Sequence, residues 1–519
     1  MEQGELIDKL VTDLYSRALD SKYEFIQFAV PWGPKVGDMY YNKKKNFDQR
    51  LCDFAKDCGI MSLGKSFYYF NGKIYERVSE EAVSLAYDQL MMKLGIANDY
   101  ATSVKVRRDK FLNIILFYNQ LHVRNDIVAF SNRVVDLRAT KGTGFMGTYK
   151  FDPKWHVVDY HDYPYAPDAK CPKFMRFLDE VLPEKRSRDI LQMFLGLGLV
   201  QTSEAFDKAS GGPRGTVELC LVLLGSGANG KSVLFNIMCA LFGKHHVTSV
   251  DYETMTAEGD EGLRGRATIR SALFNWSSDS DAKKFAQKNT HIFKRIISGE
   301  PFQYRLLGKD IMESHSCPYL IFSLNSLPNN ISDSSRGMLR RLQFVNFDVT
   351  IPKYKQNPNL AYEIIQKELP GIFNWVLRGA REVRRRNFQF PPSDASLKAK
   401  VRSLITTNPV VAWTMAYGVR SEQLAPTENG FLFSLTTLYN CFKVFMENND
   451  EEVPSINKFS RTLNTLNFEK KRRKEGVFIV TYGISEAKLR APMFIGALKD
   501  DSESTEKFEN DGESFIRND

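Results

Sequence analysis

The chain has 519 residues, 43% of them hydrophobic, and a formal net charge of +9. This length exceeds what a single core supports, so several domains are expected, and the mild positive charge favours a polyanionic partner without excluding an ordinary basic enzyme. Seven scattered cysteines exclude a zinc or disulfide framework and predict a reduced cytoplasmic protein, while the lack of an apolar run of about 18 residues excludes membrane classes.

Residues 1–209 predict an N-terminal domain of mixed, mainly helical character. Two strand-like runs within residues 66–75 flank an Asn-Gly turn, which predicts a β-hairpin. Apolar residues at helical spacing between 171 and 200 predict two helices that separate at Pro183.

Residues 210–350 alternate between strands and helices, which predicts an α/β domain. The apolar run Leu219–Leu224 predicts a buried parallel strand, and a helix is expected from Ser232 to about Phe242. The glycine-rich loop between them reads Gly225-Ser226-Gly227-Ala228-Asn229-Gly230-Lys231-Ser232. It supplies the backbone N–H groups, glycines, cation and hydroxyl that a triphosphate and Mg²⁺ require, so we expect an ATP site here rather than a chance glycine turn.

Polar residues that follow two further predicted strands extend this candidate site. ATP hydrolysis needs a carboxylate at the end of a neighbouring strand, and Ser271–Trp276 is such a strand. Asp279 and then Asp281 are its candidate Mg²⁺ ligands, with a solvated loop as the alternative. Tyr319–Leu324 predicts another strand, which ends at Asn325; this amide is a candidate for orienting the attacking water, or a turn former.

Basic residues precede the last predicted strand of the domain. Arg336, Arg340 and Arg341 come just before the alternating run Leu342–Phe347. An arginine at this position could stabilise the γ-phosphate bound to a neighbouring subunit, and a surface patch is the alternative. The adjacent histidines 245 and 246 fit a turn after a helix better than a metal site, because no cysteine or carboxylate cluster is near in sequence.

The remainder of the chain predicts three further segments. Residues 351–405 predict a helical lid or linker with a basic cluster near its end. Residues 406–490 predict a smaller domain, with helices over Ser434–Met446 and Ser455–Leu466 and a hairpin over Phe468–Tyr482. Residues 491–519 are acidic and poor in apolar side chains, which predicts a disordered tail.

In combination these motifs resemble the superfamily 3 helicases, and more narrowly the helicase part of phage, plasmid and poxvirus-type primase-helicases. The likeness covers roughly residues 65–485, and Tyr165–Pro172 is its most telling segment before the ATPase. The motifs that carry it are the glycine-rich loop, Ser278-Asp279, Lys294, Ser298-Gly299-Glu300-Pro301, Asn325-Ser326-Leu327-Pro328 and Arg340-Arg341.

The resemblance implies an α/β chain with a P-loop AAA+-like ATPase core and a C-terminal winged-helix domain. It also implies a homo-hexameric ring that moves on single-stranded DNA and binds ATP between subunits. Carried over to this sequence, the roles are Lys231 as a phosphate ligand, Ser232 and Asp279 as Mg²⁺ ligands, and Asn325 as the sensor. Arg341, beside Arg340, is the candidate arginine finger.

The resemblance also implies two DNA contacts. A hairpin lining the ring's channel would carry Leu307-Gly308-Lys309 at its tip, so Lys309 and Arg305 would grip the DNA backbone. A second contact would lie on the wing, where a solvated edge is the alternative; its residues are Lys470, Lys471, Arg472 and Arg473.

Two departures from the family pattern affect these expectations. The family commonly has glutamate where this chain has Asp279. Asp281 therefore remains the alternative candidate for the Mg²⁺ ligand. Residues 1–65 are too short for an archaeal-type primase core, so a primase is expected on another polypeptide.

The sequence therefore predicts an ATP- and Mg²⁺-dependent replicative helicase of a phage or mobile element. It would act on forked duplex DNA in the cytoplasm. A separate primase or polymerase is the expected protein partner, and no association with a membrane is expected. The rival is an initiator or loader ATPase that binds DNA and assembles without processive unwinding. A packaging ATPase would need a nuclease or capsid-docking domain, and none is visible.

Overall fold

The computed structural model of the chain describes residues 3–19, 47–94, 101–123, 127–137, 147–200, 217–280, 285–286, 288–315, 317–326, 338, 340–393, 396, 398–400, 405, 408–421, 430–484 and 489. The chain divides into two compact units, Met1–Tyr165 and Ala166–Asp519. Helices alternate with strands and the second unit holds a parallel sheet, which confirms the predicted α/β class. No helix in the described ranges is both long and apolar enough to cross a bilayer. All seven cysteines are free thiols.

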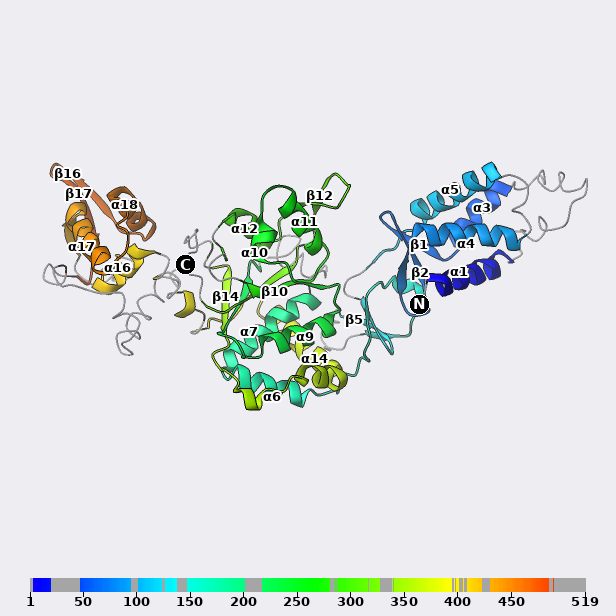
Figure 1. The fold of residues 1–519 in the computed structure, drawn as a ribbon, viewed down its shortest axis with the longest axis horizontal. Coiled ribbons are helices and arrows are strands. Elements are labelled where there is room, and N and C mark those ends of the chain that lie inside the picture. The colour runs from blue at the N-terminus through cyan, green and yellow to red at the C-terminus, as the bar shows by residue number, and fades with distance from the viewer. Residues whose placement is uncertain are drawn as a thin grey trace, which may run out of the picture. The chain divides into compact units, whose positions relative to one another are not determined.

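The first unit combines helices with two small sheets (Figure 1). Its helices are α1 (Gln3–Ala18), α3 (Phe47–Asp57), α4 (Glu80–Lys93), α5 (Ala101–Tyr118) and the short η2 (Pro153–Trp155). One antiparallel sheet contains β1 (Ile60–Leu63), β2 (Ser66–Phe70) and β3 (Tyr75–Val78). The other has the order β6-β5-β4-β7, with β4 (Ile127–Phe130), β5 (Val134–Asp136), β6 (Gly147–Tyr149) and β7 (Tyr160–His161).

The predicted hairpin over residues 66–75 is present as β2 and β3. Its second strand begins at Tyr75 rather than at Lys73, because the Asn71 side chain accepts the backbone N–H groups of Lys73 and Ile74 at 2.9 and 3.0 Å. These bonds hold the intervening residues as a turn.

A parallel sheet in the order β14-β8-β13-β10-β9 lies at the centre of the second unit. Its strands are β8 (Cys220–Leu224), β9 (Val247–Thr248), β10 (Phe274–Ser280), β13 (Tyr319–Leu324) and β14 (Leu342–Asn346). Every residue of β8 is buried, as expected for a strand covered on both faces. The expectation that the carboxylate strand adjoins β8 is wrong: β13 lies between β8 and β10.

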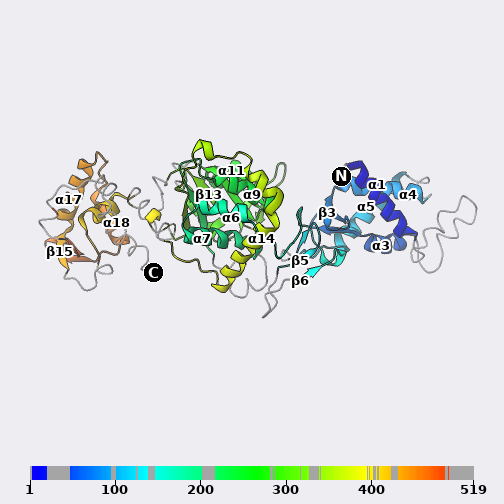
Figure 2. The same ribbon diagram turned by 90° about the horizontal axis from the view of Figure 1, so that it is seen from below.

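Helices cover both faces of this sheet (Figures 1 and 2). One face carries α10 (Tyr252–Thr256), α11 (Gly259–Ile269) and α12 (Thr290–Ile297), and the other carries α6 (Pro172–Val181), α7 (Lys185–Gly196), η3 (Leu197–Leu199), α9 (Lys231–Phe242) and α14 (Leu360–Arg385). A short η4 (Lys353–Lys355) precedes α14.

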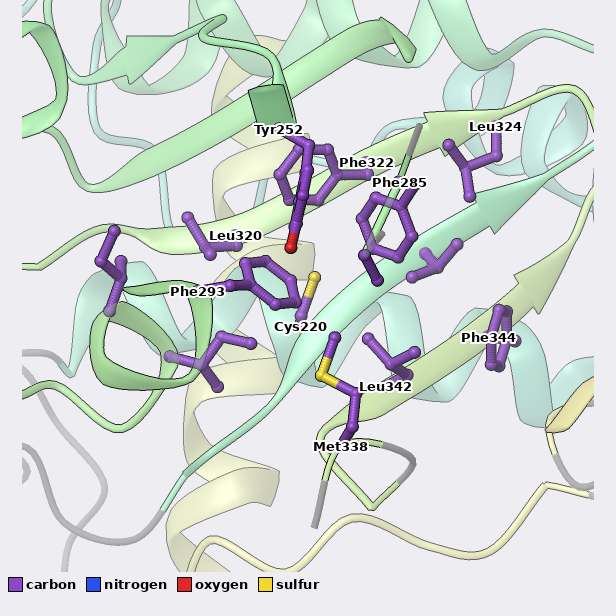
Figure 3. Packing of buried hydrophobic residues seen from close by; sticks show 14 of the residues in the cluster. Cys220, Tyr252, Phe285, Phe293, Leu320, Phe322, Leu324, Met338, Leu342 and Phe344 are labelled. Atoms are coloured by element: carbon purple, nitrogen blue, oxygen red, sulfur yellow. The ribbon is translucent and has the colours of Figure 1, made fainter. Parts of the chain in front are cut away.

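Aromatic side chains fill the core on both faces. Figure 3 shows Tyr252, Phe285 and Phe293 gathered around Phe322 of β13. The ring centroids of Phe285 and Phe322 are 5.1 Å apart. On the opposite face Trp276 of β10 meets Phe235 of α9 at 5.7 Å. Burial of such large rings stabilises the sheet that positions the loop after β8.

The helices α6 and α7 belong to the second unit, which begins at Ala166. Close packing of α7 on α14 accounts for this placement. A Cβ on Gly196 would lie 2.3 Å from the Ala380 nitrogen, and one on Gly379 would lie 2.0 Å from the Gln192 oxygen. Such contacts join segments that are far apart in sequence.

The described residues after α14 include three helices, α16 (Pro409–Tyr417), α17 (Leu435–Asn448) and α18 (Ile456–Thr465). An antiparallel sheet in the order β15-β17-β16 accompanies them, with β15 (Phe431–Ser434), β16 (Lys470–Arg473) and β17 (Gly476–Thr481). The two helices and the hairpin predicted for this part are thus present. The predicted acidic tail, 491–519, lies outside the described residues.

Candidate functional site

The loop between β8 and α9 holds a buried cation. Lys231, the first residue of α9, is only 7% exposed. Its Nζ donates hydrogen bonds to the Gly225 carbonyl oxygen at 2.6 Å and to Asn229 Oδ1 at 3.0 Å. A charge out of water needs such acceptors, so the ammonium group is fixed against the loop that precedes its own helix.

Backbone conformation shapes the same loop. Gly227, Ala228 and Gly230 have φ angles of 109°, 50° and 84°, in the left-handed region that favours glycine. A Cβ on Gly225 would lie 2.0 Å from Asn229 Nδ2 and 2.7 Å from the Phe347 oxygen, so only glycine fits there. The first turn of a helix leaves backbone N–H groups without intrahelical partners. The loop and its lysine therefore fit a phosphate chain.

Hydrogen bonds tie the loop to the neighbouring strands. Asn229 Nδ2 donates to the Phe347 oxygen at 3.3 Å, and the Ile351 N–H donates to the Ala228 oxygen at 2.8 Å. The Gly225 N–H donates to the Leu324 oxygen at 3.0 Å, which brings the end of β13 alongside the loop. The next residue is the exposed Asn325, so the backbone of the predicted sensor residue lies next to the glycine-rich loop.

The predicted carboxylate strand reaches the same edge of the sheet. Ser280 of β10 is in register with Leu324 of β13, which is itself in register with Leu224 of β8. The backbone of Asp279 immediately precedes Ser280 in β10. Ser232 is exposed in the first turn of α9. Two predicted site residues, Asp281 and Arg336, and the Leu327-Pro328 segment lie outside the described residues.

The two arginines before β14 differ in their surroundings. Arg341 Nη2 lies 2.6 Å from Glu218 Oε2 and donates to Ser298 Oγ at 3.1 Å, and its side chain is 12% exposed. Arg340 Nη2 lies 3.3 Å from the same Glu218, and its side chain is 59% exposed. Arg341 is therefore engaged within its own chain, whereas most of Arg340 faces solvent. No sequence pattern around Glu218 indicates this pairing.

The motif around Ser298 closes α12 and leads into a hairpin, as expected. The Ser298 N–H donates to the Lys294 oxygen at 2.9 Å, and Gly299 turns the chain with a φ of 74°. The hairpin consists of β11 (Phe302–Arg305) and β12 (Ile311–Ser314).

The tip of the hairpin contains the predicted residues. Leu307 is 82% exposed, and Gly308 has a φ of 68°. Arg305 Nε donates to the Lys309 oxygen at 2.9 Å, and Arg305 Nη1 lies 3.3 Å from Asp260 Oδ1. Arg305, which was expected to bind DNA, thus also stabilises the turn that carries Lys309.

The basic residues of β16 fall into two kinds. Lys470 Nζ donates to the Ser460 oxygen at 2.8 Å, and partial burial lowers the pKa of Lys470. Lys471, Arg472 and Arg473 are exposed, although Lys471 lies 3.5 Å from Glu469. Lys470 therefore connects β16 to α18 by a hydrogen bond, and the other three residues face solvent.

Comparisons with known proteins give two findings. A family model described as a family of unknown function, DUF5906, matches residues 223–341. Three solved structures of the NrS-1 C-terminal region resemble the chain at 11% identity, with TM-scores of 0.44, 0.41 and 0.40. The first two cover 84% of this chain and 98% of theirs, and the third covers 83% and 99%. The matched family span contains the lysine of the loop, the hairpin and both arginines, and its description names no activity.

Proposed function

We propose that the chain is an ATP-dependent replicative DNA helicase of a phage or mobile element. It moves on single-stranded DNA as a homo-hexameric ring and hydrolyses ATP between subunits. The observation that carries the proposal is the buried Lys231, held on Gly225 and Asn229 of a glycine-rich loop that follows a central parallel strand. Lysine is rarely buried, and this one supplies the cation that a P-loop requires.

Residues of the loop and of the ends of two neighbouring strands have parts in binding and hydrolysing ATP. Lys231 and the backbone N–H groups of the loop hold the phosphates, and Ser232 with Asp279 or Asp281 would hold Mg²⁺. That ion, when bound, neutralises charge on the β- and γ-phosphates. Asn325 follows the strand whose last carbonyl accepts the Gly225 N–H, which suits it to orient the attacking water.

Arg340 is the better candidate for the arginine that acts on a neighbouring subunit. A guanidinium that stabilises charge on another chain must be free to leave its own surface. Arg340 is largely exposed, whereas Arg341 is mostly buried between Glu218 and Ser298. In this proposal Arg341 orders the segment before β14, and Arg340 completes the site in trans.

The DNA contacts lie on one exposed turn and one exposed strand. Lys309 at the hairpin tip binds the phosphate backbone, and Arg305 holds that turn. Lys471, Arg472 and Arg473 on β16 provide a second contact in a winged-helix domain. The protein acts in the cytoplasm, and a separate primase or polymerase is the expected partner at the fork.

A forked-duplex unwinding assay with ATP tests the function, run beside size measurement with a nonhydrolysable ATP analogue. We expect strand separation that requires ATP and Mg²⁺, together with a ring-sized assembly. The Lys231→Ala variant is the matched control and should separate no strands. Nucleotide-dependent assembly without strand separation would instead support an initiator or loader.

A further inference from the structure

Arg266 of α11 is a buried cation outside the site described above. It is 7% exposed, and desolvation lowers its pKa. Its Nε donates to the Gln303 oxygen of β11 at 2.8 Å. Its Nη1 donates to the Met255 oxygen at 3.0 Å and to the Ala257 oxygen at 3.1 Å, at the end of α10. One side chain thus joins α10, α11 and the base of the hairpin.

Further contacts link α11, or Arg270 just after it, to the hairpin. Arg305 pairs with Asp260 at 3.3 Å, and both side chains are nearly half exposed. The Arg270 guanidinium lies 5.8 Å from the Tyr304 ring, and Ser314 Oγ donates to the Arg270 oxygen at 3.1 Å. Exposed ion pairs contribute little, whereas charged donors on buried carbonyls contribute more. Among these contacts, Arg266 is the one whose donor is both charged and buried.

The helix α10 is itself fixed to α11. A Cβ on Gly262 would lie 1.7 Å from the Ala257 oxygen, and one on Gly265 would lie 2.8 Å from Thr254. Such contact leaves no room for the two helices to slide. The short spacing of Gly259, Gly262 and Gly265 is the sequence signal that could have indicated this packing.

A buried side chain of β10 holds the segment that leads into α10. Asn275 is fully buried, its Oδ1 accepts the Val250 N–H at 2.8 Å, and its Nδ2 donates to the Val250 oxygen at 2.8 Å. The same strand carries Asp279 near its end. Hydrogen bonds and close packing therefore run without a break from β10 through α10 and Arg266 to β11.

We propose that Arg266 is a positioning residue that fixes the β11–β12 hairpin to the end of α10, so that a movement of β10 reaches Lys309. This inference rests on the proposed helicase function. Arginine suits the role because its planar fork donates in several directions at once, to carbonyls of two different elements. Lysine keeps the charge but loses that fork.

The test compares Arg266→Lys with Arg264→Lys in the full-length chain. Arg264 lies on the same helix, and its side chain is 56% exposed, so it is the matched control. We expect Arg266→Lys to keep DNA-independent ATP hydrolysis near wild type. The ATP consumed per base pair unwound should rise about tenfold. Hydrogen–deuterium exchange should also increase over residues 302–314, and Arg264→Lys should change none of these.

Three results would overturn the proposal. They are an unchanged ATP cost of unwinding, an equal loss of hydrolysis and unwinding together with a lower melting temperature, and unchanged exchange over the hairpin. Arg266→Gln, which removes the charge, should increase exchange further than Arg266→Lys. If wild-type protein hydrolyses no ATP, the helicase function fails by itself, and the exchange comparison still decides whether Arg266 fixes the hairpin.

Discussion

Lys231 Nζ lies 2.6 Å from the Gly225 carbonyl oxygen, so the first residue of α9 is bonded to the start of the loop that precedes it. We predict that Lys231→Ala lowers ATP hydrolysis by at least about 100-fold, because the loop loses its cation for the developing phosphate charge. Phosphate release measures the effect. Lys244→Ala, an exposed lysine just beyond the other end of α9, is the control and should hydrolyse normally. Normal turnover by Lys231→Ala would end the enzyme proposal.

Substitutions of the two arginines before β14 should have different effects. Arg340→Ala is predicted to fold normally and lose about 100-fold or more of ATP hydrolysis in the assembled state. Arg341→Ala should instead lower the melting temperature, since Glu218 loses the closer of its two arginine partners, at 2.6 Å against 3.3 Å.

Mixing two inactive variants shows whether Arg340 acts between subunits. The Arg340→Ala subunit keeps Lys231, and the Lys231→Ala subunit keeps Arg340. In a mixed ring some interfaces therefore combine an intact Lys231 from one subunit with an intact Arg340 from its neighbour, so part of the ATP hydrolysis should return. No recovery in rings that are shown to be mixed would argue against action in trans.

The hairpin tip should matter for unwinding rather than for hydrolysis. Lys309→Ala is predicted to retain DNA-independent ATP hydrolysis and to lose strand separation on a forked duplex, because the phosphate contact is removed. Lys185→Ala is a suitable control, since its side chain is 81% exposed and lies on α7 rather than on the hairpin. Undiminished unwinding by Lys309→Ala would remove the hairpin from the mechanism.

Lys400 offers a test of stability against pH. The Lys400 side chain is buried, and burial lowers its pKa to about 8. The pKa of a lysine in the unfolded chain is about 10.4. The unfolded chain binds the proton more tightly, so the cost of burying the charge is complete below about pH 8 and falls as the pH rises toward about 10.4.

Lys400→Met should therefore raise the free energy of unfolding near neutral pH, by up to about 3 kcal/mol. The gain should shrink at about pH 9.5 to 10. Thermal unfolding of the variant and wild type at both pH values measures it, with the exposed Lys353→Met as control. A gain that is absent at neutral pH, or that grows with pH, would contradict the buried-charge argument.

Features of the site that are contiguous in sequence could be predicted from it. The apolar run Leu219–Leu224 indicated a buried strand, and β8 covers Cys220–Leu224. The loop and α9 followed from glycine spacing and helical periodicity, both of which are local. The resemblance to a helicase family indicated the hairpin, and Gly308 provides the positive φ that its turn requires.

Contacts between distant segments could not be predicted in the same way. The position of β13 between β8 and β10 depends on how the chain crosses over, which no local pattern specifies. The pairing of Arg341 with Glu218 spans more than a hundred residues, and nothing near Glu218 marks it. The packing of α7 on α14 depends on glycines whose close neighbours lie on the other helix.

Equilibrium titration of ATP and Mg²⁺ into the purified chain, at protein concentrations that span assembly, tests the central claim most directly. The account predicts saturable binding with a Kd between about 1 μM and 1 mM, weakened at least about tenfold by Lys231→Ala. The claim would be contradicted if the heat or fluorescence signal did not saturate with ATP in any assembly state. It would also be contradicted if Lys231→Ala bound ATP as tightly as the wild type.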